Sequence, residues 1–267
     1  MKKTILITGS TDGIGKLAAT NLAIAGHTLY IHGRNKEKVT HTVQEIAKLA
    51  NTENVYGLVA DFSNLEEVVL LADQIKKVKL VIDILINNAG VFKTAKPTND
   101  ANFDMRIAVN YFAPFVFTHA LLPLLKATRS RIINLSSAAQ SSVETTVLNG
   151  EHHTSEQESY AQSKLALLMW SFYLAANVSE VTTIAVNPGS LLNTKMVQQA
   201  YGQFWSSADK GAHILQELAL NVDYQESSGL YFDNDKGSFS RANSDAYDRE
   251  KIEKLIKNTK EIIHQYI

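Results

Sequence analysis

A tyrosine and a lysine stand four positions apart in the segment Tyr-Ala-Gln-Ser-Lys, residues 160–164. Residues at this spacing lie on one face of a helix, so both side chains can reach the same bound molecule. An ammonium group beside a phenol stabilises the phenolate and lowers the pKa, which would make Tyr160 a proton donor or acceptor near neutral pH. Ser137, which follows a run of apolar residues, carries a hydroxyl that can hydrogen-bond a carbonyl or alcohol oxygen. These three side chains predict proton transfer at an oxygen atom of a ligand.

A glycine-rich segment with the spacing G-x-x-x-G-x-G covers residues 9–15, between an apolar run and a helical pattern. Such a turn lets the backbone approach a ligand closely and directs the free N–H groups of the helix at an anion. The spacing differs from the G-x-G-x-x-G of many dinucleotide-binding domains, and Ser10 stands where an ATPase phosphate loop requires glycine. Its place after the first strand favours a dinucleotide site over a plain tight turn.

The end of the second apolar run reads His-Gly-Arg-Asn, residues 32–35, and contains no acid. An acid at this point of such a fold would bind the ribose 2′-OH of NAD. Arg34 instead offers a rigid guanidinium fork that suits a 2′-phosphate, so NADP(H) is favoured over NAD(H). Asp12 argues in the other direction, because an acid beside the phosphate-binding turn does not help to bind a more anionic cofactor. The sequence therefore leaves NAD(H) open.

The elements that must position these residues alternate along the chain. Nearly continuous apolar runs, typical of parallel strands covered on both faces, occupy residues 4–8, 28–32, 55–60, 81–87, 131–135, 181–187 and 229–232. Helical periodicity covers residues 14–25, 36–49, 65–76, 103–127, 160–176 and 244–266. This alternation predicts an α/β fold, a single doubly wound, Rossmann-type domain over residues 1–267 with a mostly seven-stranded parallel sheet and helices on both faces. Ligands of such sheets bind at the carboxyl ends of the strands.

Composition excludes several classes of function. The 267 residues include 26 basic and 27 acidic side chains, and the net charge of -1 argues against a broad surface for nucleic acid or anionic lipid. The absence of cysteine excludes disulfides, thiolate zinc sites and cysteine nucleophiles.

No membrane segment is expected either. The first apolar run is too short for a signal peptide or an anchor, and the most apolar stretch, residues 108–125, is broken by polar residues and prolines. We therefore expect a cytoplasmic protein with a small-molecule substrate, no nucleic-acid partner and no membrane anchor. The amphipathic helix at 244–266 is expected to dock on its own domain, with a membrane-surface helix as the alternative.

Taken together, the motifs resemble the short-chain dehydrogenase/reductase superfamily over nearly the whole chain. Each motif is weak alone, but their order and placement are specific. The matching pieces are Thr8–Gly15, Asp61, Asn87–Gly90, Asn110, Ser137, Tyr160 with Lys164, and Asn187–Gly189. Residues 33–35, the long spacing before Tyr160 and residues 231–233 are most similar to retinol dehydrogenase-like and carbonyl reductase-like members.

The resemblance implies an oxidoreductase that transfers hydride between the nicotinamide of NADP and a carbonyl or alcohol carbon of a small, apolar substrate. It implies that Tyr160 is the catalytic acid/base and that Ser137, rather than Ser136, fixes the substrate oxygen. Lys164 would lower the pKa of Tyr160 and bind the nicotinamide ribose. Asn110 would hold a water molecule in a proton relay. No metal ion is needed for this chemistry.

The resemblance also assigns contacts to the cofactor. The glycine turn would surround the pyrophosphate, Arg34 and Asp61 would meet the adenosine end, and residues 188–194 would cover the nicotinamide. The implied cofactor-binding residues are Gly9, Ser10, Thr11, Gly13, Ile14, Gly15, Arg34, Asn35, Asp61, Phe62, Asn88, Ala89, Gly90, Tyr160, Lys164, Pro188, Gly189, Ser190 and Thr194.

Two segments depart from the family pattern. An insertion at residues 138–158 contains His152, His153 and several acids, but it lacks the i, i+4 histidine spacing of a helical zinc site, so we predict a solvated acidic loop. This insertion would either wall the substrate pocket or cover the helix surface through which many relatives dimerise, which leaves both a homodimer and a monomer open. Residues 190–206 are rich in apolar side chains and predict a lid over an apolar substrate, with a packed-down surface loop as the alternative.

Two other functions stay open. A catalytically silent dinucleotide-binding regulatory or scaffold protein would have the same fold, although it would not need Asn110, Ser137, Tyr160 and Lys164 together. A sugar-nucleotide epimerase-like enzyme also uses the Tyr-x-x-x-Lys pair. Such enzymes usually carry a larger C-terminal substrate domain than the residues after position 187 provide.

Overall fold

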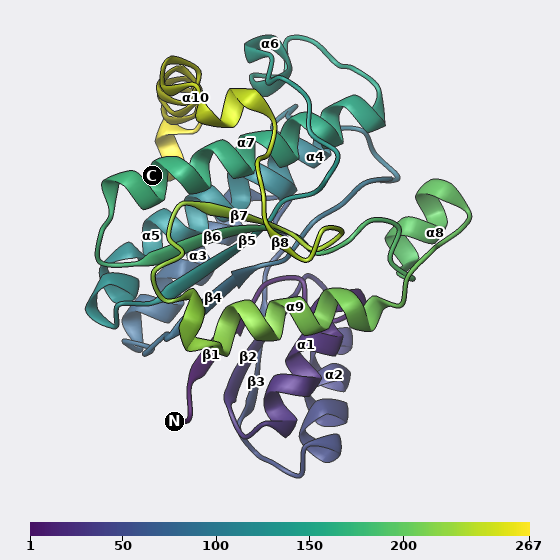
Figure 1. The fold of residues 1–267 in the computed structure, drawn as a ribbon, viewed down its shortest axis with the longest axis vertical. Helices are drawn as coiled ribbons and strands as arrows, with labels where there is room; N and C mark the ends of the chain where they lie inside the picture. The colour runs from purple at the N-terminus through teal and green to yellow at the C-terminus, as the bar shows by residue number, and fades with distance from the viewer.

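The computed structural model describes residues 1–267, and all its strands belong to one sheet with the order β3-β2-β1-β4-β5-β6-β7-β8 (Figure 1). Seven strands run parallel: β1 (Thr4–Ile7), β2 (Thr28–Gly33), β3 (Val55–Val59), β4 (Ile84–Asn87), β5 (Arg131–Leu135), β6 (Thr182–Asn187) and β7 (Leu230–Asp233). The two-residue strand β8 (Ser238–Phe239) pairs antiparallel with β7 at the edge. The predicted seven-stranded parallel sheet is confirmed, and β8 is an addition too short to leave a sequence pattern.

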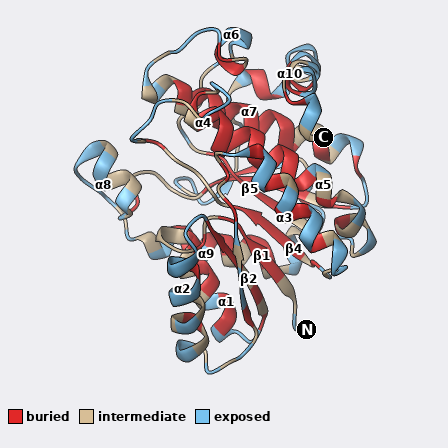
Figure 2. Cartoon of the chain, turned by 180° about the vertical axis from the view of Figure 1, so that it is seen from behind, coloured by how far each residue is buried: buried red, intermediate tan, exposed pale blue.

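Helices cover both faces of the sheet (Figures 1 and 2). One face carries α1 (Gly13–Ile24), α2 (Lys36–Leu49) and α9 (Ala208–Leu220). The other carries α3 (Leu65–Lys77), α4 to α5 (Met105–Ala127) and α7 (Glu156–Asn177), with α10 (Arg249–Ile262) packed outside α7. Ile5 and Ile7 of β1 belong to the first core and Leu6 to the second. Burial on both sides explains why the strands read as continuous apolar runs.

The order of the strands places a crevice at the carboxyl edge of the sheet. Strand β1 pairs with β2 on one side and with β4 on the other, so the chain order reverses there. In doubly wound sheets this reversal is where a ligand finds room between the loops. The glycine turn after β1 and the segment after β4 therefore both border the crevice.

The long core helix has three parts: α4 (Met105–Ile107), a π-helical turn η1 (Ala108–Phe112) and α5 (Ala113–Ala127). By length and composition it is the one helix that could cross a membrane, contrary to the expectation that no window is long enough. However, 72% of its most apolar window is buried inside the protein, which accounts for the apolar composition. The π-helical turn contains Asn110, and such turns are frequent at functional sites.

Three helices escaped the sequence analysis. They are α6 (Thr145–Leu148) in the insertion, α8 (Lys195–Tyr201) in the predicted lid, and α9. The last predicted helix is divided into a 3-10 turn η3 (Ser244–Tyr247), α10 and a 3-10 turn η4 (His264–Tyr266), and another 3-10 turn, η2 (Val222–Tyr224), follows α9. Leu255 and Ile256 of α10 are buried in the core on α7, so this helix docks on its own domain, as expected.

Candidate active site

A cavity of about 1130 Å³ opens at the carboxyl ends of the central strands. This volume slightly exceeds the ~1,000 Å³ upper end for a site that holds one small molecule, so a dinucleotide and a substrate can share it. Most of the predicted site residues line it: Gly9, Thr11, Gly13, Ile14, Gly15, Arg34, Asp61, Phe62, Asn88, Ala89, Gly90, Ser137, Tyr160, Lys164, Pro188, Gly189 and Thr194.

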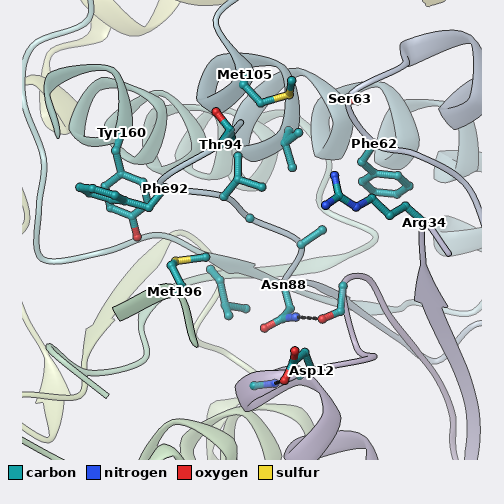
Figure 3. A pocket seen from close by; sticks show the side chains of 18 of the residues that line it. Asp12, Arg34, Phe62, Ser63, Asn88, Phe92, Thr94, Met105, Tyr160 and Met196 are labelled. Carbon is teal, nitrogen blue, oxygen red and sulfur yellow. Dashed lines mark hydrogen bonds between the residues drawn. The ribbon is translucent and has the colours of Figure 1, made fainter. Parts of the chain in front are cut away.

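The glycine turn is locked against the end of β4. The Asn88 side chain donates hydrogen bonds to the carbonyl oxygens of Thr8 at 2.8 Å and Gly9 at 2.9 Å (Figure 3). Gly9 has φ +62°, and a Cβ atom there would come within 2.6 Å of the Ala89 Cα atom. A Cβ atom on Gly15 would collide with the Asn88 amide. Glycine is therefore required at both positions for the close approach of the two segments, and the cradle they leave fits a pyrophosphate.

His32 is a site residue that the sequence analysis missed. Its Nδ1 accepts from the Gly9 N–H at 3.2 Å, and its Nε2 lies 3.0 Å from the Ala60 carbonyl oxygen. Its ring also packs on Phe62, with 4.1 Å between the ring centroids. Burial lowers the pKa of His32 to about 4, so the ring is neutral and ties the glycine turn to the end of β3. The sequence signal for this role was a histidine within an apolar run that predicts a buried strand.

Three predicted cofactor residues make hydrogen bonds within the framework, and their cofactor contacts stay predictions. The Ser10 hydroxyl donates to the Ile7 carbonyl oxygen at 2.7 Å and accepts from the His32 N–H. The Asn35 side chain caps α2 by accepting from the Lys38 N–H at 2.8 Å. Ser190 donates from both its N–H and its hydroxyl to the Asp235 carboxylate. None of the three lines the cavity, because local hydrogen bonds hold each side chain in the framework.

The adenosine end of the cavity carries the predicted cation. Arg34 is exposed at the cavity rim, forms no ion pair and lies beside Phe62 (Figure 3). Asp12 is held by two ammonium groups, from Lys38 at 3.1 Å and Lys195 at 3.0 Å. Partial burial favours its neutral form, but these hydrogen bonds prevail and lower the pKa of Asp12 to about 2. The two lysines neutralise Asp12, which removes the sequence argument against a more anionic cofactor.

Tyr160 and Lys164 lie on α7 at the bottom of the cavity. The Lys164 ammonium is 5.5 Å from the centre of the Tyr160 ring and donates to the Leu135 carbonyl oxygen at 2.8 Å. Burial lowers the pKa of Lys164 to about 8. Burial also raises the pKa of Tyr160 to about 12, although the Ser137 side chain opposes this shift. The expected lowering of this pKa by Lys164 is therefore not observed: burial has the largest effect on the phenol, and the ammonium is directed at the Leu135 carbonyl oxygen.

The two adjacent serines after β5 divide their tasks. The Ser136 hydroxyl is buried and donates to the Lys164 carbonyl oxygen at 2.9 Å, which anchors α7 to the sheet. The Ser137 hydroxyl accepts from the Ala139 N–H at 3.1 Å and belongs to the cavity wall beside Tyr160. This placement agrees with the choice of Ser137 as the residue that meets a substrate oxygen.

Asn110 braces the catalytic region from below. Its Oδ1 accepts from the Val91 N–H at 2.7 Å, and its Nδ2 donates to the Val91 carbonyl oxygen and to the Ser163 hydroxyl, each at 3.0 Å. The side chain does not line the cavity, and both its amide hydrogens are used by the protein. One lone pair of Oδ1 remains for a water molecule, so the proposed relay stays a prediction.

The predicted lid stands at the cavity mouth, where α8 projects from the body (Figure 1). No residue of α8 is buried, and the following Trp205 is 74% exposed, so α8 is not packed down on the body, and its role as a lid stays a prediction. The lid meets the site through Phe92, whose ring centroid lies 5.6 Å from that of Tyr201 and 4.8 Å from that of Tyr160. Thr194 caps α8, and its methyl carbon would lie 3.7 Å from a Cβ atom placed on Gly13.

The insertion at 138–158 lies away from the cavity, and none of its residues lines it. The Ser142 hydroxyl donates to the Asp245 carboxylate at 2.7 Å, and the Asn258 side chain donates to the Thr145 hydroxyl at 3.0 Å. The insertion is thereby joined to η3 and α10 (Figure 1). The insertion does not wall the cavity, and its role at a pairing surface stays a prediction.

The chain is similar to known proteins in both sequence and structure. Residues 3–203 match the family model described as short chain dehydrogenase. Human retinol dehydrogenase 13 is 31% identical over 86% of this chain and 76% of its own length. Human polyprenol dehydrogenase is 29% identical over 88% of this chain and 77% of its own length. A short-chain dehydrogenase of Shigella flexneri, solved in complex with NADP, is 26% identical and superimposes with a TM-score of 0.70 over 87% of this chain and 97% of its own.

These matches include the glycine turn, both catalytic candidates on α7 and the helices that carry them. The fold binds a nicotinamide dinucleotide, and its members act on CH–OH and C=O groups. The chain belongs to the short-chain dehydrogenase/reductase family, with retinol dehydrogenases among its relatives.

Proposed function

We propose that this protein is an NADP-dependent oxidoreductase that transfers hydride between the nicotinamide and a carbonyl or alcohol carbon of a small apolar substrate, with Tyr160 as acid/base. One observation carries the proposal: Tyr160, Lys164 and Ser137 border the same cavity as the glycine turn. The nicotinamide supplies or accepts the hydride, whereas the protein binds, orients and moves the proton.

The protonation states support reduction of a carbonyl. With a pKa of about 12, the Tyr160 phenol keeps its proton at neutral pH and can donate it to the oxygen of a carbonyl group. Ser137 lies beside it to hold that oxygen. The Lys164 ammonium, buried behind Tyr160, is placed to stabilise the phenolate left after the proton has moved.

The preference for NADP is supported by the unpaired guanidinium of Arg34 at the adenosine end and by the neutralised Asp12. A relative whose structure holds NADP adds to this support. The 2′-phosphate is suited to a guanidinium fork, and the exposed position of Arg34 leaves the fork free to receive it.

An apolar substrate is supported by the residues between Tyr160 and the lid. Phe92, Met105, Leu192, Met196 and Val197 line this part of the cavity (Figure 3). Relatives with the names retinol dehydrogenase and polyprenol dehydrogenase point to apolar alcohols and their aldehydes. We therefore expect turnover with apolar aldehydes, ketones or alcohols rather than with charged sugars.

The test replaces the phenol hydroxyl. We expect Tyr160→Phe to lose at least about 100-fold in kcat with the apolar carbonyl panel, since the proton donor is removed. Its affinity for NADPH, measured by cofactor fluorescence, should stay unchanged. Tyr201→Phe is the matched control, because Tyr201 reaches the same Phe92 ring from the lid but lies outside the proposed proton path.

Two outcomes contradict the proposal. Activity of Tyr160→Phe equal to that of the wild type would remove Tyr160 from the chemistry. NADPH binding without turnover of any panel substrate by the wild type would instead support the catalytically silent regulatory or scaffold protein.

A further inference from the structure

A fully buried ion pair between Asp104 and Arg106 lies next to the proposed catalytic tyrosine. We propose that this pair positions Tyr160 from two sides, an inference that rests on the acid/base role proposed above for Tyr160. The Asp104 carboxylate caps α4, and its Oδ1 accepts from the Arg106 N–H at 2.8 Å. The Arg106 guanidinium donates two further hydrogen bonds to this carboxylate, from Nε to Oδ1 at 2.9 Å and from Nη2 to Oδ2 at 2.7 Å. The side chains are 3% and 2% exposed.

The first side is the loop after β4. Arg106 Nη1 donates to the Phe92 carbonyl oxygen at 3.1 Å, and Nη2 donates to the Pro97 carbonyl oxygen at 3.4 Å. The Phe92 ring packs on Tyr160 with 4.8 Å between the centroids (Figure 3). The residues between these two carbonyl groups are mostly exposed, so the guanidinium supports this loop from inside, as Asn110 does at Val91. It thereby sets where Phe92 meets the phenol ring.

The second side is the first turn of α7. The Ser159 hydroxyl donates to Asp104 Oδ2 at 3.0 Å, and Arg106 Nη1 lies 3.4 Å from the Glu156 carboxylate. Glu156 begins α7, and Ser159 directly precedes Tyr160 in the chain. The Asp104 carboxylate therefore holds the side chain of Ser159, next to Tyr160, while the guanidinium holds the backbone of Phe92, whose ring packs on Tyr160.

Stability alone does not explain such a pair. The cost of removing both charges from water can exceed their attraction, and apolar residues of similar volume often serve as well. Here every hydrogen-bonding group of the pair has a partner. The five guanidinium hydrogens and both carboxylate oxygens form bonds with groups on α4, α7 and the loop after β4. A fixed geometry matters for proton transfer, since a displacement of about 1 Å can cost about 100-fold in rate.

The test uses two buried serines of the same helix. Ser159→Ala removes only the bond to Asp104. Ser171→Ala, farther along α7, removes the bond to the Leu167 carbonyl oxygen and the bond accepted from Asn134 Nδ2. Both side chains are 0% exposed. We expect Ser159→Ala to lower kcat by about 10- to 100-fold without changing the Kd of NADPH. We expect Ser171→Ala to lower the melting temperature at least as much as Ser159→Ala does, and to keep the wild-type kcat. Ser159→Thr, which retains the hydroxyl, should recover most of kcat.

A second measurement does not depend on turnover. In protein carrying tyrosine labelled with ¹³C at Cζ, the Tyr160 resonance, assigned by its loss in Tyr160→Phe, should shift or broaden in Ser159→Ala and stay in place in Ser171→Ala. An unchanged resonance and kcat in Ser159→Ala overturn the positioning role, as does an equal loss of kcat in both variants. If the wild type turns over nothing while the resonance still moves in Ser159→Ala alone, the proposed function fails and the positioning of Tyr160 stands.

Discussion

Tyr160 and Lys164 are displaced from their ordinary pKa values in opposite directions by the same cause. Burial disfavours the charged form of each, so the pKa of the phenol rises to about 12 and that of the ammonium falls to about 8. At neutral pH the phenol is therefore protonated and most of the ammonium is charged. This is the combination that proton donation to a carbonyl oxygen requires.

We propose that Arg34 sets the cofactor preference. We expect Arg34→Ala to raise the Michaelis constant for NADPH far more than that for NADH, because only NADPH carries the phosphate that meets the guanidinium. Steady-state kinetics with both cofactors measure this difference. Lys36→Ala is the control, since Lys36 is a nearby exposed cation at the start of α2 that does not line the cavity. Equal effects of Arg34→Ala on both cofactors would contradict the NADP preference.

His32 should make the fold sensitive to mild acid. Its pKa is lowered from 6.5 to about 4, so below pH 6.5 the unfolded chain binds a proton that the folded protein does not, and stability falls as the pH falls. The shift implies a loss of about 2 kcal/mol between pH 7 and pH 5. Urea unfolding at both pH values should show this loss in the wild type and less of it in His32→Gln, which keeps a donor and an acceptor but does not titrate. Equal losses in the two proteins would show that His32 is not the titrating group.

At the scale of elements, α8 is held at the cavity mouth by few contacts. An isolated β-bridge between Leu192 and Ser206 joins the segments before and after α8. The Lys195–Asp12 ion pair joins the first residue of α8 to the glycine turn. The pair is exposed, with side chains 74% and 45% accessible, and such pairs contribute about 1 kcal/mol at most. A weak, exposed link thus joins α8 to the glycine turn.

We expect Lys195→Met to accelerate NADPH dissociation up to about fivefold at low salt, because the link to the glycine turn is removed. Stopped-flow fluorescence measures this rate. The acceleration should vanish near 1 M salt, where the wild-type pair is itself screened. Lys236→Met is the matched control, since Lys236 pairs with Asp233 at 3.3 Å and does not line the cavity. A slower release, or the same acceleration in the control, would show that the pair does not restrain the lid.

At the scale of the whole molecule, the outer surface of α7 is covered by the chain itself. The insertion, η3 and α10 all pack there, and the buried Tyr111 hydroxyl lies 2.7 Å from the Thr259 hydroxyl of α10. This surface of α7 is therefore not free for a second subunit. The same packing buries Leu255 and Ile256, which would otherwise form an apolar patch.

We accordingly expect the protein to be a monomer in solution, because its own chain takes the place that a second subunit would need. Light scattering behind a sizing column should give a mass near 29.5 kDa. A mass of twice that value, independent of dilution, would show that another surface is used for pairing.

The sequence by itself determined most of the framework. The strands were predicted almost to the residue because burial on both faces demands uninterrupted apolar runs, and that demand is local. The glycine turn and the Tyr160–Lys164 pair were equally readable, since their chemistry depends on residue type and short spacing. The helix α9 was missed although it is amphipathic, with Ala212, Leu215 and Ala219 buried on one face. The division of residues 244–266 was missed although Asp248, a typical N-cap residue, begins α10.

Only the tertiary structure decided how individual polar groups are used. Ser10, Asn35 and Ser190 have suitable types for cofactor contacts, yet each is held by hydrogen bonds within the framework. The sequence predicted a lowered pKa for Tyr160 from its neighbour Lys164, but burial raises it. Which distant groups meet, and how much water they lose, depends on packing between segments far apart in the chain, and local sequence does not record either quantity.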